Sequence, residues 1–176
     1  MKTTTAKKMN ETKNGNSSKS AIDRPENPGK PQMKWGSDVV AEVTRQLDLK
    51  YIALVPGASY RGFHDSIVNY LGNQNPQMVI CLQEEHAVSI ADGYGKVTEE
   101  PMAVALHSNV GLMHATMTIF NAWCDRTPMI IFGATGPVDA YKRRPWIDWI
   151  HTAKGQASLI RHYKKWDDQP ALPPAA

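Results

Sequence analysis

Two adjacent carboxylates, Glu84 and Glu85, follow directly after an apolar run at residues 78–82. Apolar residues then occur three, four and seven positions after Glu84, which is the spacing of one helix face. A helix that begins here places Glu84 on its apolar side and leaves Glu85 and Asp92 on more exposed sides. Two interpretations remain open. Glu84 is either a first-turn carboxylate stabilised by the helix dipole, or a partly buried carboxylate that shares a proton with a ligand nitrogen.

Histidine and cysteine side chains are further candidates, because both can act on ligands or bind metals. His107 ends the apolar run at 101–106, and His114 lies in an apolar stretch with helical spacing. From spacing alone, a structural hydrogen-bonding role is the favoured interpretation of both histidines. Cys81 and Cys124 are far apart and each lies among apolar residues, which predicts buried, reduced thiols. No CxxC motif or His/Cys cluster is present, so the sequence predicts no metal site.

Short apolar runs alternate with amphipathic stretches along the chain and predict the elements that position these residues. The expected strands are at 51–55, 77–82, 101–106 and 128–133. The first three are each followed by a stretch with helical spacing, and another such stretch, with Ser37 as its expected N-cap, precedes the first strand. Near-continuous apolar strands with short connections are typical of parallel sheets. The predicted fold class is therefore α/β: a doubly wound, mostly parallel sheet with helices on both faces.

The segment after residue 136 is less regular. Arg143 and Arg144, together with nearby tryptophans, form either an anion site or a solvated or interface loop, and the loop is the favoured interpretation. The spacing further along predicts a short helix at 155–163 and an edge strand at 164–168.

Ligands of open parallel sheets bind beyond the carboxyl ends of the strands. This rule selects four segments, VPGASY, LQEEH, LHSNVG and FGATGP, which should lie along one edge of the sheet. Three of them contain glycine, which lets the backbone approach a ligand closely. Neither GxGxxG nor GxxxxGK[ST] occurs in the sequence. The edge is therefore suited to a flat, mostly apolar ligand with a few polar contacts rather than to a polyphosphate.

Composition divides the chain into parts. Residues 1–34 carry eight Lys/Arg and three Asp/Glu, so their charge is +5, whereas the remainder carries twelve against fourteen, or −2. The basic leader at 1–34 has almost no large apolar residues and is predicted to be disordered; its few arginines and missing aromatics disfavour nucleic-acid binding. Residues 35–169 form the expected domain, and 170–176 resemble the start of a linker. With no apolar run of membrane-spanning length and no signal peptide, a cytoplasmic protein is expected.

The stretch LQEEHAVSIADGYGKVTEEPMAVALHSNVGLMHATMTIFNAWCDRTPMIIFGATGP resembles the pyrimidine-binding domain of thiamine diphosphate-dependent enzymes, in the branch of acetolactate synthase and benzoylformate decarboxylase. The resemblance extends from about residue 34 to 169. It implies that Glu84 hydrogen-bonds the aminopyrimidine ring and promotes the imino tautomer that removes the C2 proton, so that a 2-oxo acid is attacked and the cofactor acts as electron sink. The implied catalytic residues are Glu84 and His107, and the implied cofactor-binding residues are Pro56, Gly57, Glu84, Ser108, Gly111 and His114.

Several positions depart from the family pattern. His107 matches an active-site histidine of benzoylformate decarboxylase-like members, where acetolactate synthases usually carry Ser or Thr. The family often has Asn where His114 stands and Gln near Thr135, and Ala58 replaces a catalytic Ser of the benzoylformate branch. The resemblance therefore leaves the substrate open within the 2-oxo acids and argues against the benzoylformate reaction itself.

The family's diphosphate- and Mg²⁺-binding domain, with its GDG motif, has no counterpart in the sequence. The resemblance thus implies an N-terminal piece or one subunit of a split enzyme, with a non-catalytic remnant as the alternative. Its expected partner is a diphosphate-binding domain of the same or another chain, in a homo-oligomer. Alone, the chain is expected to be inactive. The sequence does not indicate whether FAD is bound as well.

Overall fold

The computed structural model describes residues 24–25 and 32–170. The disordered leader predicted at 1–34 and the linker predicted at 170–176 lie almost entirely outside these residues, so both stay predictions.

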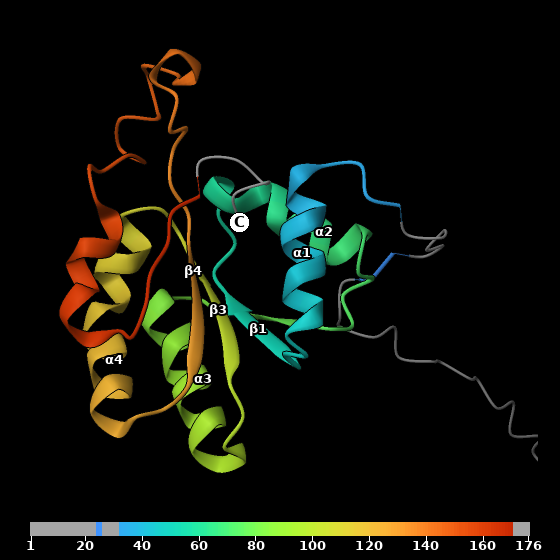
Figure 1. Ribbon diagram of the computed structural model, residues 1–176, viewed down its shortest axis with the longest axis vertical. Coiled ribbons are helices and arrows are strands. Elements are labelled where there is room, and N and C mark those ends of the chain that lie inside the picture. Colours follow the sequence, from blue (N-terminus) through green and yellow to red (C-terminus); the bar gives the residue numbers. More distant parts are fainter. Residues whose placement is uncertain (1–23, 26–31, 171–176) are drawn as a thin grey trace, which may run out of the picture.

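The described residues form a four-stranded sheet in which all neighbouring strands are parallel (Figure 1). The strands are β1 (Tyr51–Leu54), β2 (Gln77–Ile80), β3 (Met102–Leu106) and β4 (Met129–Gly133), and their order across the sheet is β2-β1-β3-β4. Each lies inside a run predicted from the sequence and is shorter by one or two residues. The predicted parallel α/β fold is confirmed.

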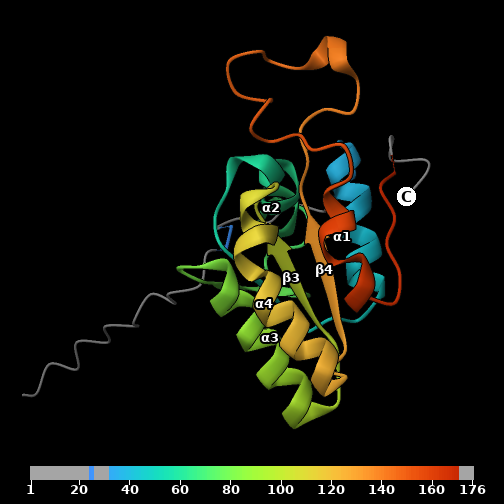
Figure 2. The same cartoon turned by 90° about the vertical axis from the view of Figure 1, so that its left-hand side faces the viewer.

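Helices connect the strands and cover the sheet on both sides (Figures 1 and 2). They are α1 (Gly36–Gln46), the 3₁₀ turn η1 (Ala58–Tyr60), α2 (Arg61–Asn69), α3 (Glu84–Thr98), α4 (Val110–Asp125), η2 (Ala140–Lys142) and η3 (Gln156–Tyr163). The edge strand predicted at 164–168 is wrong, because this segment does not pair with the sheet. Its residues are mostly charged, and Lys164 forms an ion pair with Asp167 inside the segment itself.

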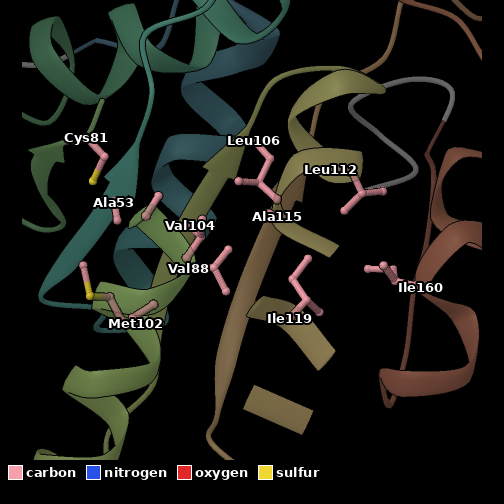
Figure 3. Packing of buried hydrophobic residues seen from close by; sticks show 12 residues of the cluster. Ala53, Cys81, Val88, Met102, Val104, Leu106, Leu112, Ala115, Ile119 and Ile160 are labelled. Atoms are coloured by element: carbon pink, nitrogen blue, oxygen red, sulfur yellow. The ribbon is translucent and has the colours of Figure 1, made fainter. Parts of the chain in front are cut away.

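Alternation along the strands divides the core into two clusters. Ile52 and Leu54 of β1 pack with residues of α2 on one face of the sheet, whereas Ala53 points to the opposite face. That opposite face is covered by α3, α4 and η3, and Figure 3 shows its cluster, with Val104 of β3 between the two long helices and Ile160 closing it from η3. Both faces are therefore dry, as expected for parallel strands.

The first helix begins differently from the prediction. Ser37 is not the N-cap; the helix is instead preceded by Trp35, whose backbone N–H donates to Asp38 Oδ2 over 2.9 Å. Asp38 Oδ1 accepts a second bond from the Ser66 hydroxyl, at 2.7 Å, which ties the start of α1 to α2. A carboxylate can accept several donors at once, so Asp38 does more here than the Ser37 hydroxyl, whose oxygen lies 2.9 Å from Ser66 Oγ.

Two burial predictions are also corrected. Asp92 was expected on an exposed face, but it is buried, because Lys96 binds it at 2.7 Å and simultaneously reaches Asp125 of α4 at 2.6 Å. The carboxylate thus belongs to an ion bridge between α3 and α4. Cys81 is buried as predicted, whereas Cys124 is exposed near the end of α4.

The two faces of β1 give a first prediction. Leu54→Ala should lower the free energy of unfolding by about 2–5 kcal/mol, because Leu54 is 1% exposed and its loss leaves a cavity beneath α2. Leu82→Ala, at a leucine that is 89% exposed, is the matched control and should change it by less than about 0.5 kcal/mol. Urea unfolding followed by circular dichroism measures both; equal effects would contradict the assignment of the core.

Candidate functional site

The carboxyl ends of β1, β2 and β3 bring three loop segments together. The loop after β2 is short, so α3 starts at Glu84 itself, with Gln83 as its N-cap. The loop after β3 is bonded to the loop after β1, because the backbone N–H of Ser108 donates to Ser59 Oγ at 3.2 Å. The edge selected from the sequence is therefore a single connected structure.

Glu84 is the more enclosed of the two neighbouring carboxylates. Its side chain is 14% exposed, against 45% for Glu85, as the helical spacing predicted. Being at the first turn of α3, Glu84 also lies where the helix dipole favours negative charge. Glu84 is thus both enclosed and at a helix start, so its position is compatible with the helix-dipole interpretation and with the ligand interpretation.

His114 of α4 contacts Glu84 directly. Its Nδ1 lies 3.0 Å from Glu84 Oε2, and its Nε2 lies 3.9 Å from Glu85 Oε2. The hydrogen bond to Glu84 raises the pKa of the His114 imidazole, and the negative charges of Glu85 and Glu84 contribute to the same direction. The histidine that spacing alone assigned to a structural role is therefore the immediate partner of the candidate carboxylate.

Two glycines, Gly57 and Gly111, have no Cβ, and this allows His107 and Glu84 to pack closely against the backbone. A Cβ on Gly111 would lie 3.0 Å from the His107 Cβ and 3.1 Å from Glu84 Oε1. A Cβ on Gly57 would lie only 2.5 Å from the His107 ring, a distance that real contacts do not show. Gly57, Glu84, His107 and Gly111 are thus packed against one another, although they are separated in the sequence.

Tyr60 was not singled out from the sequence, although it ends the selected segment VPGASY. The side chain is buried, and its hydroxyl has no hydrogen-bond partner within the described part of the chain. Burial raises the pKa of Tyr60, and the charges of Glu84 and Cys81 raise it further. An unpaired buried hydroxyl is costly, and one beside a carboxylate at a sheet edge is a candidate ligand contact. Its place at the end of this segment, three residues after Gly57, was the signal available in the sequence.

The loop after β3 contains two more buried polar groups. The Ser108 hydroxyl and the Asn109 side-chain oxygen have no partner among the residues that the structure describes. Asn109 adopts a left-handed backbone with φ 54°, and its amide donates to the Ile150 carbonyl at 3.0 Å. This bond fixes the loop against the segment that projects beyond the carboxyl edge of the sheet (Figure 1).

The remaining candidates lie at the margin of the site. Pro56 is exposed on the loop after β1. Arg144 binds Asp148 at 2.9 Å, and Arg143 donates to the Pro137 carbonyl at 2.7 Å, so both guanidinium groups are engaged within their own loop. This favours the loop interpretation of the arginine pair over an anion site.

Within residues 24–25 and 32–170, no three His, Cys, Asp or Glu side chains are grouped so that they could hold a metal ion. In the same part of the chain, no helix is both long enough and apolar enough to cross a membrane.

Residues 34–165 match the protein family described as thiamine pyrophosphate enzyme, N-terminal TPP binding domain. The acetolactate synthase large subunit of Lactococcus lactis is 29% identical over 108 residues, which are 61% of this chain and 18% of that protein. The corresponding subunit of Haemophilus influenzae is 28% identical over 96 residues, 54% of this chain and 16% of that protein. The chain therefore spans less than a fifth of the length of these two relatives.

Two solved structures have the same fold as this chain. Benzoylformate decarboxylase from Polynucleobacter necessarius superimposes with a TM-score of 0.64 at 23% identity, covering 79% of this chain and 24% of that chain. A thiamine diphosphate-dependent 4-hydroxybenzoylformate decarboxylase from Rhodococcus jostii gives a TM-score of 0.65 at 22% identity, covering 78% of this chain and 24% of that chain. At this identity the likeness concerns the fold.

Gly93 of α3 and Gly111 of α4 give a second prediction. Gly93→Ala should raise the free energy of unfolding by about 0.5–1 kcal/mol, because nothing lies within 4 Å of the added methyl group. Gly111→Ala should not give this gain, because its methyl group meets His107 and Glu84. Chemical denaturation of both variants measures the difference. An equal gain at both positions would show that Gly111 is not required for close packing.

A pair of tyrosines gives a third prediction. Tyr60→Phe should leave the free energy of unfolding unchanged or raise it by about 1 kcal/mol, because it removes a buried hydroxyl that has no partner in the part of the chain that the structure describes. Tyr70→Phe is the control and should lower it, because the Tyr70 hydroxyl donates to Glu42 Oε2 at 3.2 Å. Thermal unfolding of the two variants tests this; a clear loss of stability for Tyr60→Phe would mean that its hydroxyl has a structural partner.

Proposed function

This chain belongs to the thiamine pyrophosphate enzyme family, as its N-terminal TPP binding domain, and we propose that it holds the aminopyrimidine ring of thiamine diphosphate where β1, β2 and β3 end. The observation that carries the proposal is the enclosed Glu84 carboxylate. Its Oε2 is hydrogen-bonded to His114, and its Oε1 lies next to Gly111, which has no side chain. A flat nitrogen heterocycle that approaches this surface meets an acceptor able to share a proton with it.

The residues at the edge fit such a ring. Gly57 and Gly111 let His107 and Glu84 pack closely at this edge, and the buried hydroxyls of Tyr60 and Ser108 have no hydrogen-bond partner among the described residues. The assigned cofactor contacts are Pro56, Gly57, Glu84, Ser108, Gly111 and His114, with Tyr60 added from the structure. When bound, thiamine diphosphate supplies the carbon nucleophile and electron sink for chemistry on 2-oxo acids. Glu84 holds the proton at the ring nitrogen, which is the catalytic role we assign to it.

His107 is the residue we assign to the 2-oxo acid. It follows β3 directly, packs against Gly57 and Gly111, and its ring centroid lies 5.1 Å from that of His151. An imidazole at this edge can bind a carboxylate or transfer a proton. The sequence relatives are acetolactate synthases and the solved structures are decarboxylases, so the proposal covers both kinds of 2-oxo acid chemistry.

We assign the diphosphate and Mg²⁺ contacts to a second domain, on the same or another polypeptide. The proposed docking face for such a partner, or for a second copy in a homo-oligomer, is the outer side of α4. Large apolar side chains recur there every three or four residues and are 42–65% exposed: Val110, Met113, Met117, Phe120 and Trp123. A continuous exposed apolar face on a helix beside the site is typical of an interface.

The fourth prediction tests the role of Glu84. In an enzyme reconstituted with a diphosphate-binding domain, Glu84→Gln should slow hydrogen–deuterium exchange at C2 of thiamine diphosphate by at least about a hundredfold. Glutamine keeps the shape and a hydrogen bond but has no ionisable carboxylate. Glu85→Gln is the matched control and should have little effect, because Glu85 is much more exposed. NMR of the cofactor measures the exchange rate for both variants.

Other outcomes of this experiment are equally informative. A large effect of Glu85→Gln alone would move the catalytic role by one residue. An absence of any effect would leave the helix-dipole interpretation of Glu84.

Without the second domain, the chain should bind thiamine diphosphate weakly and should not decarboxylate 2-oxo acids, which calorimetry and a coupled assay can check.

A further inference from the structure

Building on the proposed function, we propose that His114 is a positioning residue that balances the charge of Glu84. In the free protein an imidazolium at His114 pairs with the carboxylate. When the ring nitrogen of the cofactor gains a proton, His114 gives one up at Nε2. The carboxylate then stays ionised between two N–H donors, His114 Nδ1–H at Oε2 and the ring nitrogen at Oε1.

The geometry separates the two sides of the imidazole. Nδ1 lies 3.0 Å from Glu84 Oε2, where a proton on the nitrogen donates to the carboxylate. Nε2 lies 3.9 Å from Glu85 Oε2, on the more open side. The Glu84 side chain is 14% exposed, whereas that of His114 is 45% exposed. His114 therefore connects an enclosed carboxylate to solvent, and it can release a proton from Nε2 while it keeps its bond through Nδ1.

The groups around His114 determine the direction of its titration. Glu84 and Glu85 of α3 are the charged groups that act on it within the described residues, and both favour the protonated imidazole. Tyr60 interacts with Glu84 from η1, and His107 packs near Glu84 through Gly111. Because the pKa of His114 is raised in the folded protein, the stability that the ion pair contributes is present below the ordinary imidazole value of 6.5. The pair is lost as the pH rises through the raised value.

The proton balance follows from these contacts. Before the ligand arrives, one negative charge on Glu84 is matched by one positive charge on His114. A protonated ring nitrogen beside Oε1 neutralises the same carboxylate and so removes the main reason for the extra proton on His114. The N–H bond at Nε2 would break and its proton would pass to water, while water would supply the proton that forms the N–H bond at the ring nitrogen. The net charge of the site is unchanged.

An NMR titration of the histidine side chains of the full chain tests the pair without any cofactor. The midpoint for His114 should fall in Glu84→Gln and change much less in Glu85→Gln. His64 on α2, which lies beside Asp65, is the internal control and should titrate identically in all three proteins. A midpoint for His114 that does not respond to Glu84→Gln, or that responds mainly to Glu85→Gln, would overturn the proposal.

Addition of thiamine diphosphate at the His114 midpoint tests the exchange of charge. The His114 signals should move to the positions of the neutral imidazole in the wild type and should not do so in Glu84→Gln. Ligand-induced changes at Gly111 without deprotonation of His114 would overturn the charge-balancing role, because a purely structural histidine would behave in this way. If even a large excess of thiamine diphosphate, enough to saturate weak binding, changes no signal at any residue, the proposed function is contradicted instead, while the ligand-free titration still decides whether the pair exists.

Discussion

The contact between the first turns of α3 and α4 is the constraint on which the site depends. Glu84 begins one helix, and Gly111 and His114 lie in the first two turns of the other. The two helices run side by side over one face of the sheet (Figures 1 and 2). Parallel strands require this arrangement, because each strand end is followed by a helix that returns across the same sheet. The helix starts, and any carboxylate on them, are thereby brought to one edge.

Close packing between α3 and α4 holds Glu84 and His114 at the same level of the two helices. Ala87 and Ala91 of α3 and Ala115 of α4 are completely buried, and small side chains let the helix backbones approach. At the far end, Lys96 links α3 to the Asp125 carboxylate of α4. A bulkier side chain at these positions would separate the helices and move His114 away from Glu84. The contact between Glu84 and His114 therefore depends on residues that take no part in it themselves.

The sequence was sufficient for the sheet but not for every polar contact. Period and run length identified the strands, because a parallel core needs continuous apolar segments. The same spacing placed Glu84 correctly, since one helix face decides its burial. Asp92 was misplaced because an ion bridge to a second helix has no local signal in the sequence. Tyr60 was missed because its neighbours Glu84 and Cys81 are distant along the chain, and only its place at the end of VPGASY was visible in the sequence.

The chemical identity of residue 114 matters more than its ability to donate a hydrogen bond. An amide, which the resemblance leads one to expect there, would also donate to Glu84 Oε2, but it carries no charge. A carboxylate that is mostly withdrawn from water is destabilised unless a counter-charge or several donors compensate it. An imidazole supplies that counter-charge below its raised pKa and withdraws it when another cation takes its place. In the proposed exchange, the Glu84 carboxylate thus has a positively charged partner in both the empty and the occupied site, which an amide at residue 114 would not supply.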